Sequence, residues 1–186
     1  MRDLHQRHPG FRVAVAEDAR VTSMHRGESA EFDSGRQVLL AVLRLSWSSD
    51  AFFAHVCYRL RARLLARGVP VIPRLLHKIS MMTAQVSIGD PVLLQPGIYL
   101  VHGQVVLDGL VEVGSGSVIS PWVTIGLRSG NHQGPKLGRD VFLGTGAKVI
   151  GPVTVGDGAT VGAGAVVTGD VSADTTVVGI PAREAA

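Results

Sequence analysis

Two histidines in the second half of the chain are the residues best suited to chemistry. An imidazole gains and loses a proton near neutral pH, so it can act as a general acid or base. His102 lies in the run Leu-Val-His-Gly-Gln, and His132 lies in a polar stretch from Leu127 to Pro135. Function is often found in a polar stretch between regular segments. Both are therefore candidates for acid–base chemistry: His102 as a general base, and His132 as a group that orients a substrate or stabilises charge. The alternative is that both are solvated turn or loop residues.

The cysteine and histidine counts argue against other chemistry. The chain has one Cys in 186 residues, which rules out a disulfide framework and a Cys-based zinc cluster. Cys57 lies on an apolar helical stripe, and this predicts a buried side chain rather than a nucleophile. We predict no metal site.

Composition and charge exclude further classes of protein. The longest apolar run near the N-terminus, Val38 to Leu43, is far shorter than the ~20 residues of a membrane helix. Residues 1–20 lack the apolar core of a signal peptide, so we expect a soluble, cytoplasmic protein without membrane insertion. The net charge is +6 over residues 1–87 and −3 over residues 88–186. The basic part lacks the interleaved aromatic residues of a single-strand binder, so we expect no nucleic-acid partner.

The first part of the chain is predicted to be helical after a polar arm. Residues 1–33 carry no sustained hydrophobic period, and we expect a loosely ordered arm with one short helix at most. Residues 34–83 are predicted to form an α-helical segment of three helices, which begin at a capping box at Ser34, near Ser49 and after Pro73. The arginines of the middle helix are interpreted as a solvated face. The alternative is an electropositive rim that attracts a phosphorylated cofactor.

The second part has a hydrophobic period of six. An aliphatic residue returns at every sixth position, with one extra residue before Leu107 and a twelve-residue step before Leu137; the thirteen positions are Ile88, Leu94, Leu100, Leu107, Val113, Ile119, Ile125, Leu137, Leu143, Val149, Val155, Val161 and Val167. Small and turn-forming residues between them indicate short strands joined by tight turns, three strands to a coil. Residues 84–172 are therefore predicted to form a left-handed parallel β-helix of slightly over four coils. The fold class is mainly β, and residues 173–186 are expected to be a C-terminal tail.

Several motifs carry a family resemblance. They include Leu100 to Gln104, Gly144 to Pro152 and the ending Gly-Ile-Pro-Ala-Arg at 179–183, together with Tyr58-Arg59 before the β-helix. In these motifs the chain resembles the serine O-acetyltransferase family of hexapeptide acyltransferases, and especially its shorter branch, the colanic acid and exopolysaccharide acetyltransferase type. The resemblance implies transfer of an acetyl group from acetyl-CoA to a hydroxyl, in a homotrimer or a dimer of trimers. It also supports the role of His102 as the general base, and it implies that His102 and His132 meet across a subunit interface.

The resemblance further implies where acetyl-CoA binds. A pantetheine arm would lie along backbone flanked by small side chains, and Lys148 or Arg183 would meet the phosphates. The residues concerned are Gly144, Gly146, Ala147, Lys148, Gly162, Ala163, Gly164 and Arg183. Turn formation alone explains the glycines equally well.

The chain departs from the family at two carboxylates. Members of the family have an Asp directly before the catalytic His and a second Asp that orients the imidazole, whereas this chain has Val101 and Ser87 at those positions. Ser87, Asp108 or a backbone carbonyl would have to orient the ring instead. Ser87, Val101 and Gln104 are the predicted substrate-binding residues.

The missing carboxylates bear on the acceptor. Without a carboxylate beside His102, an amino-acid ammonium group loses a partner, so the sequence favours a saccharide or another small-molecule hydroxyl. Serine is the first alternative, and a non-catalytic β-helix scaffold is the second. A γ-class carbonic anhydrase shares the fold but needs three histidine ligands, and only two histidines lie in this part of the chain.

Overall fold

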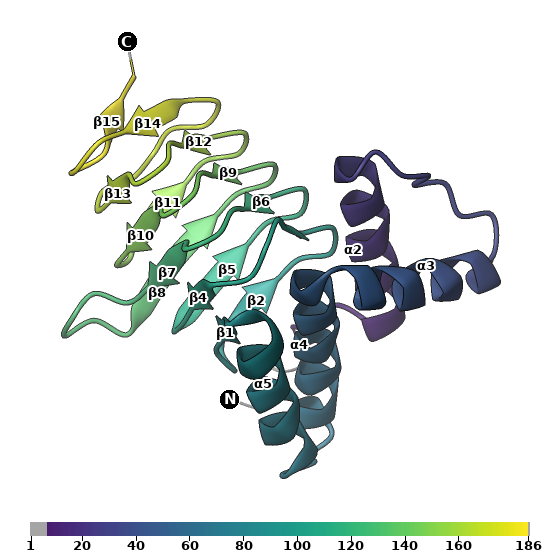
Figure 1. The fold of residues 1–186 in the computed structure, drawn as a ribbon. Coiled ribbons are helices and arrows are strands. Elements are labelled where there is room, and N and C mark those ends of the chain that lie inside the picture. The colour runs from purple at the N-terminus through teal and green to yellow at the C-terminus, as the bar shows by residue number, and fades with distance from the viewer. Residues whose placement is uncertain (1–6, 186) are drawn as a thin grey trace.

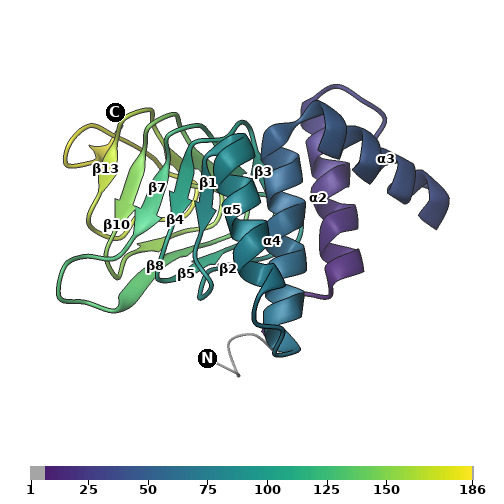
Figure 2. The ribbon, with the colours of Figure 1, turned by 60° about the horizontal axis from the view of Figure 1, so that its bottom comes forward.

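The computed structural model describes residues 7–185 and divides them into a helical cap and a β-helix (Figure 1). The helical cap contains α2 (Phe11–His25), α3 (Gly35–Ser48), α4 (Asp50–Ala66) and α5 (Ile72–Ala84). The predicted N-caps are present: the Ser34 side chain accepts a hydrogen bond from Gln37 N, and the Ser49 side chain accepts one from Phe52 N, both at 3.3 Å. Figure 2 shows the helices against one end of the β-helix, with α3 farthest from it.

The β-helix is a triangular prism with three sheets, whose strands are parallel except for the last one, β15 (Arg183–Glu184). The five-stranded sheet contains β1 (Val86–Ile88), β4 (Val105–Leu107), β7 (Thr124–Gly126), β10 (Lys148–Ile150) and β13 (Val166–Val167). The four-stranded sheet contains β2 (Leu93–Leu94), β5 (Leu110–Val113), β8 (Gln133–Leu137) and β11 (Thr154–Val155). The six-stranded sheet contains β3 (Tyr99–Leu100), β6 (Val118–Ile119), β9 (Phe142–Leu143), β12 (Thr160–Val161), β14 (Thr176–Val178) and β15 (Arg183–Glu184).

The six-residue period forms the core of the prism. Aliphatic residues stack in register from coil to coil, as where Leu107 pairs with Ile88 on one side and Ile125 on the other. All thirteen residues of the period are buried, and together they form one continuous hydrophobic cluster with their neighbours. The predicted β-helix is thereby confirmed.

The end of the prism lies beyond the predicted boundary. β14 pairs in parallel with β12, with Val177 opposite Val161, so residues 176–178 complete a fifth coil inside the segment predicted to be a tail. β15 then turns back and pairs antiparallel with β14, with Glu184 opposite Val177. The prediction of slightly over four coils is therefore too short, because Val177 falls outside the strict six-residue spacing.

The N-terminal arm contains a long helix that the sequence did not predict. Within the expected arm at 1–33, α2 spans fifteen residues and contacts α3, α4 and β3. Its buried face carries a charged residue, Asp18, among apolar residues such as Ala14, Val15 and Ala19. Asp18, on α2, accepts hydrogen bonds from Gly97 N at 2.8 Å and Ile98 N at 3.2 Å in the first coil of the prism. The buried positions are spaced as on one face of a helix, but Asp18, Thr22 and Ser23 are polar, and this weakens the hydrophobic period in the sequence.

Two arginines of α4 also differ from their predicted role, whereas Arg67, directly after this helix, is exposed as expected. Arg59 and Arg61 are buried, rather than forming a solvated face or a rim for a phosphorylated ligand. Arg59 forms a two-point ion pair with Asp18, at 2.8 and 3.1 Å, and donates to the carbonyl oxygens of Leu94 and Gln95. Arg61 donates to the carbonyl oxygen of Ile88 and pairs with Asp90 at 3.2 Å. Both guanidinium groups thus attach the helical cap to the prism.

Candidate active site

His102 lies in the turn between β3 and β4, where the six-stranded sheet meets the five-stranded sheet. The end of α5 holds this turn in place. Gln104 N donates to the carbonyl oxygen of Ala84 at 2.8 Å. Gly103 packs so closely that a Cβ at this position would overlap the same carbonyl oxygen. The imidazole itself is exposed, so its backbone is fixed while its ring remains accessible.

The same corner recurs in each coil and forms a column, which we call the His102 corner (residues 101–104, 120–123, 144–147 and 162–165). Backbone hydrogen bonds join successive turns: Trp122 N donates to Gln104 O, Gly146 N to Pro121 O and Gly164 N to Thr145 O, at 2.8 to 2.9 Å. One residue per turn has a positive φ. These residues are Gln104 (63°), Trp122 (59°), Gly146 (72°) and Gly164 (67°).

Most of the residues predicted to bind acetyl-CoA lie along this corner. Lys148 follows it at the start of β10, and Arg183 lies in β15, just after Ala182, whose amide donates to Val166 O at 2.8 Å. The corner offers open space: a Cβ on Gly164 would meet nothing within 4 Å, and one on Gly146 would only graze Gly164 at 4.0 Å. This low, open surface fits an extended pantetheine arm.

Ala147 does not fit its predicted role. Its side chain is fully buried in the prism core. Its amide donates to Gly144 O, and its carbonyl accepts from Thr124 N, both at 3.0 Å. Both backbone groups are therefore already hydrogen-bonded within the prism. Gly144 is also explained by stacking, because a Cβ there would lie 2.6 Å from Ala163 N. At these two positions the small side chain reflects the packing of adjacent coils.

The outward face of the five-stranded sheet adjoins the His102 corner. The strand register aligns one outward residue from each coil, in the order Ser87, Val106, Thr124, Lys148 and Val166. Ser87 and Lys148 thus share a face, with an exposed Val106 beside Ser87. Val101 is half-buried, next to His102. The surroundings of His102 are therefore mostly apolar and uncharged on its own chain.

His132 lies at a different corner. Residues 127–132 form a loop between β7 and β8, where the five-stranded sheet gives way to the four-stranded sheet (Figure 1). The Asn131 side chain accepts from Gln133 N at 2.8 Å, and Asn131 N donates to Arg128 O at 2.9 Å, which closes the loop. The two histidines thus lie at opposite ends of the strands of the five-stranded sheet: His102 lies where the strands begin, and His132 lies beyond where they end. A single chain does not bring them together.

No side chain of the described residues takes the place of the missing orienting carboxylate. Within residues 7–185, neither the imidazole of His102 nor that of His132 has a hydrogen bond or an ion pair. Asp108 directly follows the end of β4, where the chain turns toward the four-stranded sheet, whereas the His102 corner precedes β4. The same part of the chain contains no group of three His, Cys, Asp or Glu side chains that could hold a metal ion. It also has no helix long and apolar enough to cross a membrane.

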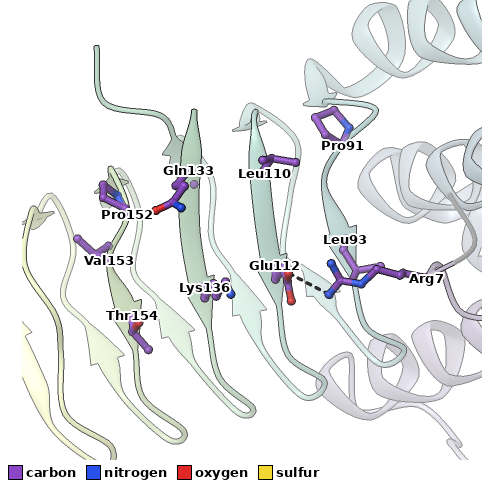
Figure 3. Close-up of a pocket in the computed structure, with 11 residues that line it drawn as sticks. Arg7, Pro91, Leu93, Leu110, Glu112, Gln133, Lys136, Pro152, Val153 and Thr154 are labelled. Atoms are coloured by element: carbon purple, nitrogen blue, oxygen red, sulfur yellow. Dashed lines mark hydrogen bonds and ion pairs between the residues drawn. The ribbon is translucent and has the colours of Figure 1, made fainter. Parts of the chain in front are cut away.

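A separate hollow of about 430 Å³ lies on the four-stranded sheet (Figure 3). It is lined by side chains from β2, β5, β8 and β11, and it contains an ion pair between Arg7 and Glu112 at 3.0 Å. Neither histidine lines it, although Gln133 follows His132 directly. The hollow therefore faces a different side of the prism from the His102 corner.

Trp122 is the notable residue of the His102 corner that the sequence analysis missed. It follows Pro121 and is 57% exposed. The signal lay in the alignment of the coils, which places a Trp in register with Gly146 and Gly164. The six-residue period draws attention to the inward aliphatic positions and hides the corner residues.

Comparisons with known proteins agree with this architecture. Residues 134–169 match the family model for the bacterial transferase hexapeptide (six repeats). A serine acetyltransferase of Synechococcus elongatus is 41% identical over 71% of this chain and 55% of its own length. One from Helicobacter pylori strain J99 is 35% identical over 70% of this chain and 78% of its own length.

Solved structures agree as well. The soybean serine acetyltransferase apoenzyme is 28% identical and superposes with a TM-score of 0.79, over 97% of this chain and 71% of that chain. A serine acetyltransferase complex with CoA is 25% identical, with a TM-score of 0.77 over 98% of this chain and 73% of that chain.

The fold and the repeats place the chain in the hexapeptide-repeat class of proteins. Within that class, the chain belongs to the serine acetyltransferase family. It spans 55% and 61% of the lengths of the Synechococcus elongatus and Bacillus subtilis relatives that it matches.

Proposed function

We propose that this protein transfers an acetyl group from acetyl-CoA to the hydroxyl of a small molecule, with His102 as the general base. The arrangement at the His102 corner carries this proposal, because an exposed imidazole and an open column of small residues share one edge of the prism. Family membership supports acetyl-CoA as the donor, since one of the similar structures is a complex with CoA.

The residues of this chain can perform direct transfer. A ring nitrogen of His102 takes the proton from the acceptor hydroxyl as its oxygen attacks the thioester carbonyl carbon. The tetrahedral intermediate then collapses, the carbon–sulfur bond breaks, and the imidazolium returns the proton to the CoA sulfur. No covalent enzyme intermediate is needed when both substrates are bound together. Lys148 and Arg183 supply positive charge for the CoA phosphates near the C-terminal coils of the prism.

His132 requires a second copy of the chain. Because His132 lies beyond the opposite end of the strands of the five-stranded sheet, it would approach His102 only from a neighbouring prism. We infer a homotrimer in which the loop at 127–132 of one chain completes the site of the next. In that site His132 orients the acceptor or stabilises charge.

Serine is the acceptor that the family relationship favours, in preference to the saccharide favoured by the sequence alone. Several similar proteins are named serine acetyltransferases, and a soybean structure 27% identical to this chain is a complex with serine. One observation favours a second candidate, a hydroxyl acceptor without an ammonium group. Val101 and Ser87 bring no carboxylate to the His102 corner.

The role of His102 is tested by measuring thiol release from acetyl-CoA. His102→Ala should lower kcat by about 10²- to 10⁴-fold, because it removes the general base. The midpoint of thermal unfolding should stay unchanged, because the ring is exposed. Lys78→Ala, at an exposed position of α5, is the control that should keep its activity. Full turnover in His102→Ala would contradict the proposal.

The acceptor is tested by the same assay with serine, homoserine and a panel of sugars. Turnover with serine supports the first candidate. Turnover only with acceptors that lack an ammonium group supports the second, in which case Val101→Asp should shift the preference toward serine. If acetyl-CoA neither reacts nor stabilises the protein against heat at saturation, the chain is a non-catalytic scaffold.

A further inference from the structure

Trp122 occupies a backbone conformation that disfavours a bulky side chain. Its φ is 59°, in the left-handed region, where a residue with a large side chain is a genuine outlier. The next two turns of the column use Gly146 and Gly164 for the same conformation. A local backbone cost at an exposed corner points to a role other than folding.

Packing within the chain does not account for the indole. The side chain of Trp122 is 57% exposed, so folding buries less than half of it. The other tryptophan, Trp47, is 92% exposed on α3, far along the helical cap. An exposed indole combines a large apolar ring with a polar N–H on its edge, and such a side chain is well suited to pack against a ligand.

The order of the coils places Trp122 on the path of the donor. The backbone ladder of the His102 corner runs from Gln104 to Trp122, then to the coils of Gly146 and Gly164. In the proposed function the phosphates of acetyl-CoA lie toward the C-terminal coils, near Lys148 and Arg183, and its thioester must reach an acceptor beside His102. Adjacent coils are separated by the ~4.8 Å spacing of neighbouring strands. The donor must therefore cross the coil of Trp122 to reach the base.

We propose that the indole of Trp122 packs against the pantetheine arm of acetyl-CoA, close to the thioester, as a donor-binding residue. This inference rests on the proposed function. It adds a specific contact that the glycine-lined coils above cannot make. Trp122 is thus a residue kept for binding at a cost to its local backbone.

The test uses the full chain with Trp47→Phe, so that Trp122 is the only tryptophan. Titration with CoA should quench or shift the Trp122 fluorescence to saturation. Adenosine 3′,5′-bisphosphate, which has the nucleotide but no pantetheine arm, should leave the fluorescence unchanged. Calorimetry in parallel reports CoA binding independently of the indole.

A pair of variants separates binding from folding. Trp122→Gly should weaken CoA binding on the order of tenfold. Its thermal midpoint should not fall, because Gly accepts the left-handed conformation without strain. Trp122→Phe should retain most of the affinity. CoA binding by calorimetry with unchanged Trp122 fluorescence, or full affinity in Trp122→Gly, would overturn the inference alone. An absence of CoA binding to the parent protein would overturn the proposed function and this inference together.

Discussion

The helical cap and the prism are stabilised in different ways. In the prism, buried aliphatic residues stack in register and backbone hydrogen bonds join each coil to the next. In the helical cap, small apolar residues such as Ala54 join the prism core, and the ion pairs and side-chain hydrogen bonds to the prism come from a few buried residues, Asp18, Tyr58, Arg59 and Arg61. Tyr58 shows the pattern, since its hydroxyl donates to Val92 O at 2.8 Å and accepts from Leu94 N at 3.3 Å.

This difference shows how stability is distributed. A repeated structure shares its stability among many similar contacts, so each coil contributes a similar part. A buried ion pair concentrates it, because the loss of one partner leaves a desolvated charge. The two regions should therefore respond differently to single substitutions and to pH.

The largest effect is expected from Arg59→Ala. It leaves the Asp18 carboxylate buried without its ion pair and removes the donors to Leu94 O and Gln95 O. The free energy of unfolding should fall by about 3–5 kcal/mol in urea denaturation. Arg67→Ala, at the exposed end of the same helix, should change it by less than about 0.5 kcal/mol. Equal effects of the two substitutions would show that the pair does not hold the cap.

A pH effect should come next in size, through His55 on α4. Burial lowers the pKa of His55 to about 4, partly opposed by the charge of Asp18, whose Oδ2 lies 3.5 Å from Nε2. The unfolded chain, with a pKa near 6.5, binds the proton more readily, so stability is present above pH 6.5 and lost as the pH falls toward 4.

The expected loss over that window is up to about 3 kcal/mol. Urea denaturation at pH 7, 6, 5 and 4 measures it. His55→Gln removes the titrating group and should flatten this part of the pH dependence. If wild type and variant lose stability in parallel, another group in the cap is responsible.

The smallest effect is expected at the junction of the two regions. A Cβ in Gly103→Ala overlaps the carbonyl oxygen of Ala84, so the end of α5 or the His102 turn must move. We expect a loss of about 1–3 kcal/mol in unfolding free energy, together with reduced turnover. Gly169→Ala is the matched control, because its Cβ would meet nothing within 4 Å. An unaffected Gly103→Ala enzyme would show that the helical cap does not position His102.

The sequence predicts the prism better than the cap for a physical reason. The period of six is local, and every aliphatic position repeats the same environment, so the pattern alone identifies the coils. The position of the helical cap also depends on single polar contacts between distant residues, such as Asp18 with Gly97. An Asp in a polar segment looks exposed until its partner is known, so neither the length of α2 nor the burial of Arg59 follows from the pattern.

The candidate site shows the same division. His102 and His132 could be selected by residue type. Their placement at opposite ends of the strands of one sheet depends on how the strands between them are assigned to the three sheets. Ala147 was selected because it is small, and the structure turns it into the core. Trp122 was missed because its significance comes from the turns stacked above and below it.

The two ends of the prism also decide whether it can grow. A stack of parallel strands offers unpaired backbone groups at its last coil, where a second chain could add by the same pairing. At one end α5 and α4 cover the first coil. At the other, β15 folds back antiparallel and occupies the edge of β14. We expect this short reversed strand to limit end-to-end polymerisation, so deleting residues 179–185 should promote aggregation, although among the deleted residues only Ala182 packs against the core.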